Sequence, residues 1–326
     1  MISFIVIGRN VEPTIQKCMD SIVSFIEKNS IQDWEIIYSD SNSNDGTLKL
    51  VRNYQVTIVH IEGNLNAAIG RNEGAKIAEG DVLFFIDGDM ELITDCYDAF
   101  FRDESNLIYP FLRGAFVNVF YTSDFKRVIK EQTFKNGNSI ITEYLESKMT
   151  GGLFAITAEN WKKLNGMDER FDSNQDVDFG LRMSAQNINQ RIYHNILMAK
   201  HHTVDYYDKE RLLTFLKSTR LLCPGMLIRK HLTNRIFWPF ILRSRYSLFF
   251  LIFTISAIII SWKTAFICIV LYTVIQIVRT LRVEKLNNSR LSIFLYKVFY
   301  DLYSIIGFAF FHPREKKYKV SLENIR

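Results

Sequence analysis

Asp87 and Asp89 flank Gly88 directly after an apolar run at residues 82–86. In an extended chain, residues i and i+2 point to the same side, so the two carboxylates are expected to lie close together. Their repulsion favours a cation between them, and such oxygen ligands suit Mg²⁺ or Mn²⁺ and the phosphates these ions carry. Gly88 allows a ligand to approach the backbone. The simpler interpretation is an acidic turn, because Asp and Gly are common turn residues.

The run before these carboxylates is typical of a strand buried on both faces, as in a parallel sheet. Strand-like runs alternate with helical patterns from the first residue onward, which favours an α/β protein with helices on both faces of the sheet. The expected strands cover residues 2–7, 35–39, 56–61 and 82–86. Ligands bind beyond the carboxyl ends of such strands. The side chains of Glu12, Asp40, Asp87 and Asp89 are therefore predicted to line one crevice.

Two familiar phosphate-binding loops are absent from the sequence. It contains no Gly-x-Gly-x-x-Gly and no Gly-Lys-Ser/Thr segment, so the dinucleotide-binding and P-loop interpretations lack their phosphate cradles. A metal ion is therefore the expected neutraliser of phosphate charge in this protein.

A second group of polar residues lies in the middle of the chain. Gly151 and Gly152 precede a short apolar strand, where paired glycines let the backbone approach a ligand. Gln175 and Asp176 open a helical pattern that contains Arg182. A capping carboxylate is the simpler interpretation of Asp176, because acidic residues favour helix N-termini.

Three residues further along carry side chains that can ligate a metal. They are His201, His202 and Asp205, and both imidazole and carboxylate groups ligate metals. An exposed histidine pair fits the sequence equally well. We prefer His201, and the choice among the three stays open at this stage.

The charge of +5 is distributed unevenly along the chain. Up to residue 228 there are 24 Lys and Arg against 31 Asp and Glu, and from Arg229 onward 16 against 4. An acidic body with a basic, apolar tail favours attachment to an anionic membrane surface. The basic residues flank apolar runs and form no solvated stripe, which argues against nucleic-acid binding. The four cysteines show neither metal-ligand spacing nor a paired framework, as expected in a reducing compartment.

The tail contains two apolar runs, at residues 246–261 and 264–278, separated by Trp262 and Lys263. Basic residues flank the pair on both outer sides, which predicts a membrane hairpin with both ends in the cytoplasm. Each run is short for a bilayer span, which needs about 20 residues, and a buried hairpin in a soluble domain is the alternative. Residues 291–311 form a third apolar segment whose Lys297 and Asp301 share a helix face, which favours an interfacial helix.

The first 90 residues resemble glycosyltransferase family 2, nucleotide-sugar-dependent enzymes of the GT-A fold. Four motifs carry the resemblance in the right order: a strand ending at Asn10 and Glu12, the segment 40–47, the run 70–80 with Arg71, and Asp87-Gly88-Asp89. A second signature of the family resembles Gln175-Asp176 and the Arg182 that follows. Gln175 stands where the family has Glu.

The resemblance implies an inverting reaction that moves a sugar from a nucleotide-diphosphate donor, expected to be a UDP-sugar, to an acceptor hydroxyl. It implies Asp176 as the base and Asp40 as the acceptor of a hydrogen bond from uracil. The residues assigned to the nucleotide sugar are Glu12, Asp40, Arg71, Asp87 and Gly88. Those assigned to the acceptor are Gly151, Gly152, Gln175 and Arg182. The ligands assigned to Mn²⁺ or Mg²⁺ are Asp87, Asp89 and His201.

We therefore predict an α/β protein of GT-A fold, Rossmann-like with a mostly parallel sheet, followed by membrane helices. The expected catalytic domain covers residues 1–228 and the membrane-associated region residues 229–326, with the catalytic domain on the cytoplasmic side of the cell membrane. The expected acceptor is a lipid-linked saccharide or a surface polysaccharide. The alternatives are a polyprenol-phosphate glycosyltransferase, a sugar nucleotidyltransferase of related fold, which leaves Gln175-Asp176 without a role, and a catalytically silent membrane scaffold.

Overall fold

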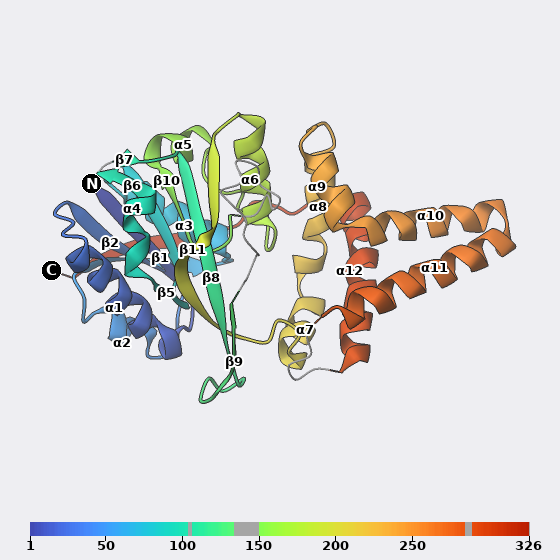
Figure 1. Ribbon diagram of the computed structural model, residues 1–326, viewed down its shortest axis with the longest axis horizontal. Helices are drawn as coiled ribbons and strands as arrows, with labels where there is room; N and C mark the ends of the chain where they lie inside the picture. Colours follow the sequence, from blue (N-terminus) through green and yellow to red (C-terminus); the bar gives the residue numbers. More distant parts are fainter. Residues whose placement is uncertain (104–105, 134–149, 284–288, 326) are drawn as a thin grey trace. The chain divides into compact units, whose positions relative to one another are not determined.

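The computed structural model of the protein describes residues 1–103, 106–133, 150–283 and 289–325 (Figure 1). The chain divides into two compact units. The sheet domain comprises Met1–Arg170, Gln175–Val204 and Arg314–Arg326. The helical domain comprises Phe171–Asn174 and Asp205–Pro313. This division differs from the expected boundary at residue 228, because the last long strand of the sheet ends at Val204 and the C-terminal residues return to the sheet.

The sheet domain contains twelve strands among its described residues. They are β1 (Ile2–Gly8), β2 (Trp34–Asp40), β3 (Val56–Gly63), β4 (Val82–Asp87), β5 (Met90–Leu92), β6 (Phe101–Asp103), β7 (Asn106–Leu107), β8 (Phe111–Tyr121), β9 (Val128–Thr133), β10 (Phe154–Thr157), β11 (Gln190–Val204) and β12 (Tyr318–Ile325). Its helices are α1 (Glu12–Lys28), α2 (Thr47–Val51), α3 (Ala67–Ile77), α4 (Tyr97–Phe100), α5 (Ala158–Lys163) and α6 (Gln175–Ala185), with a 3₁₀ turn at Thr94–Cys96.

The main sheet has the strand order β12-β3-β2-β1-β4-β10-β8-β11-β5, with β9 paired to β8. The first four strands in sequence, β1 to β4, are parallel as predicted. The rest of the sheet corrects the expectation of a mostly parallel sheet, because β10, β5, β9 and β12 all run antiparallel to their neighbours. The α/β class with helices on the sheet is confirmed.

The unbroken apolar runs of β1 and β4 are explained by burial on both faces. Phe4 and Phe84 pack with α1 residues such as Phe25 in one core cluster. Their sequence neighbours Ile5 and Phe85 point to the other face and join a cluster that includes residues of α3, α5 and α6. Successive side chains of a strand alternate between faces, so a strand with both faces covered must be apolar throughout.

Strand register brings three strand ends to one edge of the sheet. Gly8 of β1 lies beside Asp40 of β2, and Ile7 lies beside Asp87 of β4. The carboxyl ends of these parallel strands therefore present Asp40 and Asp87 on either side of the end of β1, as the sequence predicts.

The C-terminal strand β12 closes the outer edge of the sheet by pairing with β3 along its whole length. Glu323 accepts hydrogen bonds from Arg52 at 2.8 and 3.0 Å and lies 2.7 Å from His60 Nε2. Tyr318 Oη donates to Glu73 of α3 at 2.7 Å. The final residues, which the sequence analysis assigned to the membrane region, thus complete the sheet domain.

The helical domain contains α7 (Lys209–Leu216), α8 (Cys223–Lys230), α9 (Phe237–Ser244), α10 (Tyr246–Ile260), α11 (Trp262–Leu281) and α12 (Arg290–Phe310), with a 3₁₀ turn at Thr219–Leu221. Two of these, α11 and α12, are long and apolar enough to cross a membrane. A third candidate arises within the described residues only if α9 and α10, which are bent by 81°, are taken together as one span.

Two contacts fix α12 within this domain. Gly225 of α8 and Gly307 of α12 allow the two backbones to touch, since a Cβ on Gly225 would lie 2.1 Å from Ser304 O and one on Gly307 would lie 2.1 Å from Leu222 O. Arg229 of α8 donates to the last carbonyls of α12, including Gly307 O at 3.3 Å. This arginine satisfies backbone acceptors that the end of a helix leaves unpaired.

Removal of residues 314–326 tests the contribution of β12. We expect the full chain without this segment, purified in detergent, to lose about 5 °C or more in thermal midpoint and to aggregate, because an unpaired sheet edge is a template for association. The measurement is thermal unfolding together with light scattering. Glu323→Ala is the control, because its partly exposed ion pairs are worth about 1 kcal/mol or less. An unchanged midpoint in the deletion variant would contradict a structural role for β12.

Candidate active site

The carboxyl edge of the sheet is held in place around Gly88. Its amide donates to Ile7 O at 2.8 Å, and its carbonyl accepts from Thr14 Oγ1 at 3.0 Å. A Cβ on this glycine would lie 3.1 Å from Val11 Cγ2 and 3.2 Å from Ile7 O, so a larger residue would crowd both β1 and the start of α1. The two carboxylates on either side of Gly88 are thereby fixed relative to the end of β1.

Asp87 forms an ion pair with Arg71 of α3, whose guanidinium lies 2.5 Å from Asp87 Oδ1. The Arg71 side chain is only 4% exposed. The pKa of Asp87 is raised to about 6, mainly by burial and also by the nearby Asp89, against the lowering effect of Arg71. Arg71 therefore favours the charged form of a carboxylate that its surroundings would otherwise protonate.

Gly152 provides the space that Asp87 occupies. A Cβ at residue 152 would lie 1.8 Å from Asp87 Oδ2, well inside van der Waals contact. The preceding Gly151 has a φ of +71°, a conformation that favours glycine. A Cβ on Gly151 would lie 3.5 Å from the guanidinium of Arg113 on β8. The paired glycines thus lie between Asp87 and Arg113.

Asp89 faces His201 of β11, with 3.4 Å between Oδ2 and Nε2. His201 Nδ1 is 2.8 Å from Asn118 Oδ1, which accepts from its N–H. In the neutral imidazole, Nε2 then presents a lone pair to a carboxylate oxygen, and either a cation between the two atoms or a proton on Nε2 makes this contact favourable. Asp89 Oδ1 is buried and has no hydrogen-bond partner in the described part of the chain.

The donor set at Asp89 and His201 fits a divalent cation that shares its ligands with a phosphate. Among the described residues, no three His, Cys, Asp or Glu side chains are arranged to hold a metal by themselves. Mg²⁺ typically binds one or two protein carboxylates and completes its shell with water and substrate phosphates. The structure brings Asp89 and His201 together, while it pairs Asp87 with Arg71.

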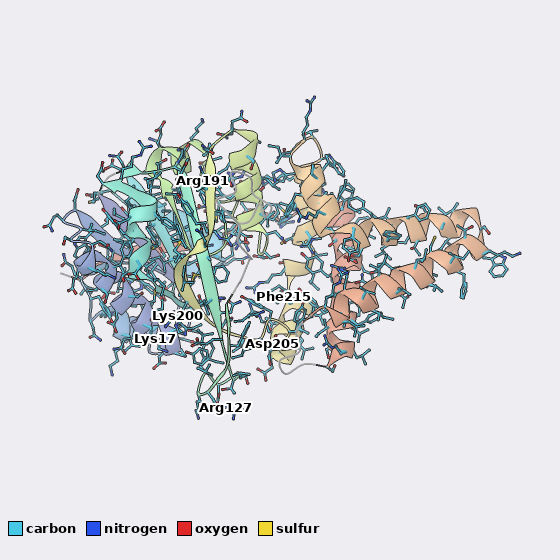
Figure 2. All side chains as sticks on the ribbon, viewed as in Figure 1. Lys17, Arg127, Arg191, Lys200, Asp205 and Phe215 are labelled. Atoms are coloured by element: carbon cyan, nitrogen blue, oxygen red, sulfur yellow. The ribbon has the colours of Figure 1, made fainter. Side chains whose placement is uncertain are left out.

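The other two candidates for the third ligand lie elsewhere. His202 points to the opposite side of β11, where Nδ1 is 2.9 Å from Tyr121 Oη and Nε2 is 3.0 Å from Glu91 Oε2. Lys17 and Lys200, labelled in Figure 2, border this group. Burial lowers the pKa of His202, despite Glu91, which favours its neutral form. Asp205 belongs to the helical domain, where it accepts from the Tyr207 amide.

Asp40 and Glu12 lie at the ends of β2 and β1. Asp40 is buried, its Oδ2 accepts from the Ser43 amide at 3.0 Å, and its Oδ1 has no partner among the described residues. Glu12 accepts from the Gly46 amide at 2.9 Å. Glu12 is thus used to shape the turn after β2, whereas Asp40 retains a buried acceptor for a ligand.

Asp176, in the first turn of α6, lies near two arginines of the same edge. Burial raises the pKa of Asp176, against the effects of the hydrogen bond that its carboxylate accepts from the Val177 amide and of the charges on Arg71 and Arg113. Its neighbour Gln175 has a buried Oε1 without a hydrogen-bond partner among the residues that the structure describes. Arg71 therefore links Asp87, which it contacts, to Asp176, which it stabilises as a carboxylate.

Asp178 and Arg182 of α6 serve the packing of the domain. Asp178 is fully buried and accepts from Arg182 Nε at 2.8 Å. Arg182 also donates to the carbonyls of Leu164 and Gly166, the latter at 2.8 Å. The two carbonyl contacts of Arg182 thus anchor α6 to the loop after α5, and the acceptor role that the sequence analysis assigned to this residue stays a prediction.

Comparison with known proteins gives the family of this region. Residues 3–146 match the family model described as glycosyl transferase family 2. The N-terminal region is a family 2 glycosyltransferase domain. The "Uncharacterized glycosyltransferase YfnE" of Bacillus subtilis is 29% identical over 127 residues, which cover 37% of this chain and 32% of that protein. The "Poly(ribitol-phosphate) beta-glucosyltransferase" of Bacillus spizizenii is 29% identical over 123 residues, 35% of this chain and 19% of that protein.

These matches span about a third or less of the relatives' own lengths. Among solved structures, S. aureus TarS 1-349 is similar, with a TM-score of 0.45, 16% sequence identity and coverage of 72% of each chain.

Two residues near the site of the family 2 domain escaped the sequence analysis. Arg113 interrupts the apolar pattern of β8, and a lone arginine in a strand is a signal that could have identified it. Burial lowers its pKa. Asn118 lies five residues further along the same strand and orients His201. No local pattern marks Asn118, because the pairing of β8 with β11 brings it to the histidine.

Gly152→Ala tests the packing of the glycine against Asp87. The added methyl group would displace the Asp87 carboxylate, and we expect Mn²⁺ affinity, measured by electron paramagnetic resonance in the presence of UDP, to fall at least about tenfold, equivalent to about 1.4 kcal/mol. Gly70→Ala in α3 is the matched control, because its Cβ would make an ordinary 3.4 Å contact with Ile7. Equal Mn²⁺ affinity in both variants would reject the proposed role of Gly152.

Proposed function

We propose that the protein is an inverting, metal-dependent glycosyltransferase that moves a sugar from a nucleotide-diphosphate donor, preferably a UDP-sugar, to a hydroxyl of a lipid-linked saccharide or surface polysaccharide. One observation carries this proposal. Asp176 lies within the electrostatic reach of Arg71, which itself pairs with Asp87 beside Asp89 and His201. A base and a site for a charged leaving group thus share one edge of the sheet of a family 2 domain.

The reaction requires one proton acceptor and one stabilised leaving group. Asp176 takes the proton of the acceptor hydroxyl as its oxygen bonds to the anomeric carbon. The bond from that carbon to the diphosphate oxygen breaks, and the nucleoside diphosphate leaves with the electron pair. Attack opposite to the leaving group inverts the anomeric centre. Arg71 and Arg113 support the ionised state of Asp176 before the proton is transferred.

Asp89 and His201 are the residues that would hold a divalent cation. Such a cation, when bound, would neutralise charge on the diphosphate leaving group. Asn118 fixes the orientation of the His201 ring through Nδ1. Asp87 is then available to the ribose or to the cation, and its contact with Arg71 limits the negative charge at the site.

Asp40 is the proposed contact for the nucleobase. Its buried Oδ1 has no partner among the described residues, and leaving a buried acceptor unpaired costs about 1–3 kcal/mol. The N–H of a uracil ring would satisfy it. On the acceptor side, the proposed contacts are Gly151, Gly152 and Gln175. A relative's name, poly(ribitol-phosphate) beta-glucosyltransferase, is compatible with a polymeric or phosphate-containing acceptor.

Membrane attachment through the helical domain is part of this proposal, with the family 2 domain on the cytoplasmic side. It is supported by the two helices that are long and apolar enough to cross a bilayer. A glycosyltransferase that is held at a membrane surface meets a lipid-linked acceptor at high local concentration.

The assignment of the base predicts different outcomes for two neighbouring aspartates. Asp176→Asn should lower the rate of sugar transfer by about 10²–10⁴-fold, the usual contribution of a general base, with thermal midpoint and donor affinity little changed. Asp178→Asn weakens a buried ion pair, and such losses cost up to about 3–5 kcal/mol, so its main effect should be on stability. The assay follows transfer from a panel of labelled UDP-sugars, together with release of UDP.

If Asp176→Asn turned over at a near-normal rate while a folded Asp178→Asn enzyme was inactive, the base would have to be reassigned to Asp178. Detection of nucleotide-sugar synthesis from a nucleoside triphosphate and a sugar phosphate, without transfer, would favour a nucleotidyltransferase.

The pH dependence of the rate gives an independent test of Asp176. Burial raises its pKa, so the reactive carboxylate is lost as the pH falls through a value above the ordinary Asp range of about 4. Arg113 lowers the pKa of Asp176. Arg113→Met should therefore move the acidic limb of the kcat profile to higher pH, whereas Lys126→Met, which removes an exposed charge after the same strand, should not. An identical shift in both variants would contradict this role for Arg113.

A further inference from the structure

Strand β12 determines that the helical domain begins and ends on the same side of a membrane. The chain leaves the sheet domain after Val204 and returns at Arg314, and β12 then pairs with β3 in the same sheet. Both connections therefore lie on one side of a membrane, and the number of crossings between them must be even. Three crossings, by α9 with α10, by α11 and by α12, are excluded because they would separate β12 from β3.

Six of the seven exposed large apolar side chains of α12, all but Phe308, form a stripe along the whole length of the helix. At 100° per residue, its members fall within an arc of about 100°. They are Leu291, Leu295, Phe299, Leu302, Ile306 and Phe310. The face with Ser304 and Gly307 is buried, and Gly307 contacts α8. Figure 1 shows α8 and the α10–α11 pair on opposite sides of α12. An apolar stripe of this kind is typical of a helix that lies in the plane of the membrane interface.

Four charged side chains meet where α10 and α11 join the middle of α12. Asp301 accepts from Gln276 Nε2 at 2.6 Å and lies 3.7 Å from Arg279 Nη1. Lys297 donates to the carbonyl of Arg279, and Arg245 donates to Tyr300 Oη at 2.6 Å. We refer to Arg245, Arg279, Lys297 and Asp301 as the charged joint.

The position of the charged joint decides which helices cross. If α12 crossed the bilayer, its middle would carry the charged joint to the centre, where each charge costs at least about 2.5–3.5 kcal/mol. If α12 lies in the interface, the joint lies at the headgroups, and the hairpin of α10 and α11 enters the bilayer from there. Lys263 is then the single Asp, Glu, Lys or Arg between Tyr246 and Val278.

The length of the hairpin takes its tip close to the far side of the membrane. From Arg279 to Lys263, α11 rises about 24 Å at 1.5 Å per residue, against a hydrocarbon core of about 30 Å. Trp262 at the tip is 76% exposed. Tryptophan favours the membrane interface, and a lysine stem extends its charge toward the headgroups.

From these observations we propose that α10 and α11 cross the bilayer as a hairpin with Trp262 and Lys263 at the opposite headgroups, while α12 lies in the interface on the side of the sheet domain, its stripe against the lipid. This inference rests on the proposed membrane attachment and goes beyond it, because it selects α10 with α11 as the crossing pair and rejects α11 with α12. The partner of this surface is the phospholipid bilayer.

Single cysteines at the two ends of α11 distinguish the arrangements. Lys263→Cys and Arg282→Cys are produced in the full chain and treated with a membrane-impermeant maleimide in spheroplasts and in inverted vesicles. Lys49→Cys marks the side of the sheet domain, and the unmodified chain is the background control because its four cysteines are buried. We expect Lys263→Cys to react only from the side opposite to Lys49→Cys, and Arg282→Cys only from the same side.

The reversed pattern, with Arg282→Cys on the opposite side and Lys263→Cys on the same side, would show that α11 and α12 cross and would overturn the inference. Labelling of all three from one side would also overturn it, because the hairpin would then not reach the far headgroups. Release of the unmodified chain from membranes by alkaline carbonate would contradict the proposed membrane attachment itself. This result is distinct from both labelling outcomes, which concern only the helices that cross.

Discussion

The contact between Arg71 and Asp87 is the interaction on which the candidate site depends. The edge of the sheet gathers Asp40, Asp87 and Asp89 at the ends of adjacent strands, and such a concentration of negative charge in a partly buried place is unfavourable by itself. Arg71, held by α3 behind the sheet, compensates Asp87 directly and acts on Asp176 at longer range. The single buried guanidinium of Arg71 thus stabilises two carboxylates, Asp87 and Asp176, whose proposed roles differ.

The glycines of the site follow from the same crowding. Asp87 reaches Arg71 only because residue 152 has no side chain, and Gly151 lies against Arg113. The ion pair between Asp87 and Arg71 therefore depends both on the charge of Arg71 and on the absence of a side chain at residue 152.

Much of this edge could be predicted from the sequence because its signals are local. Continuous apolar runs identified β1 to β4, and the polar residues that directly follow them identified Asp40, Asp87 and Asp89. His201 was a candidate on residue type alone, and the choice against His202 required β11, since alternate residues of a strand point to opposite sides. The pairing of the mixed half of the sheet, β10, β8, β11, β5 and β9, was not predicted, because its partners are distant in sequence and most of its strands have weaker patterns.

The most distant pairing was also the least predictable. Residues 318–323 alternate between apolar and polar side chains, which is a strand pattern, but this local pattern does not indicate which strand is the partner. Arg52 and Glu323 are 271 residues apart, and nothing in either local sequence indicates the other. The expected assignment of the whole tail to the membrane region followed its charge, whereas the structure places residues 318–325 at the margin of the sheet.

The position of β12 has a consequence for biosynthesis. The ribosome synthesises β3 early and β12 last, with residues 205–313 between the main part of the sheet domain and its final strand. At about 5–20 residues per second, a segment of that length takes roughly 5–20 s to translate. During this interval the apolar helices leave the ribosome while the edge of β3 still has no partner. The sheet domain is therefore completed only after the helical domain has been synthesised, so the edge strand pairs as the last step in a set order.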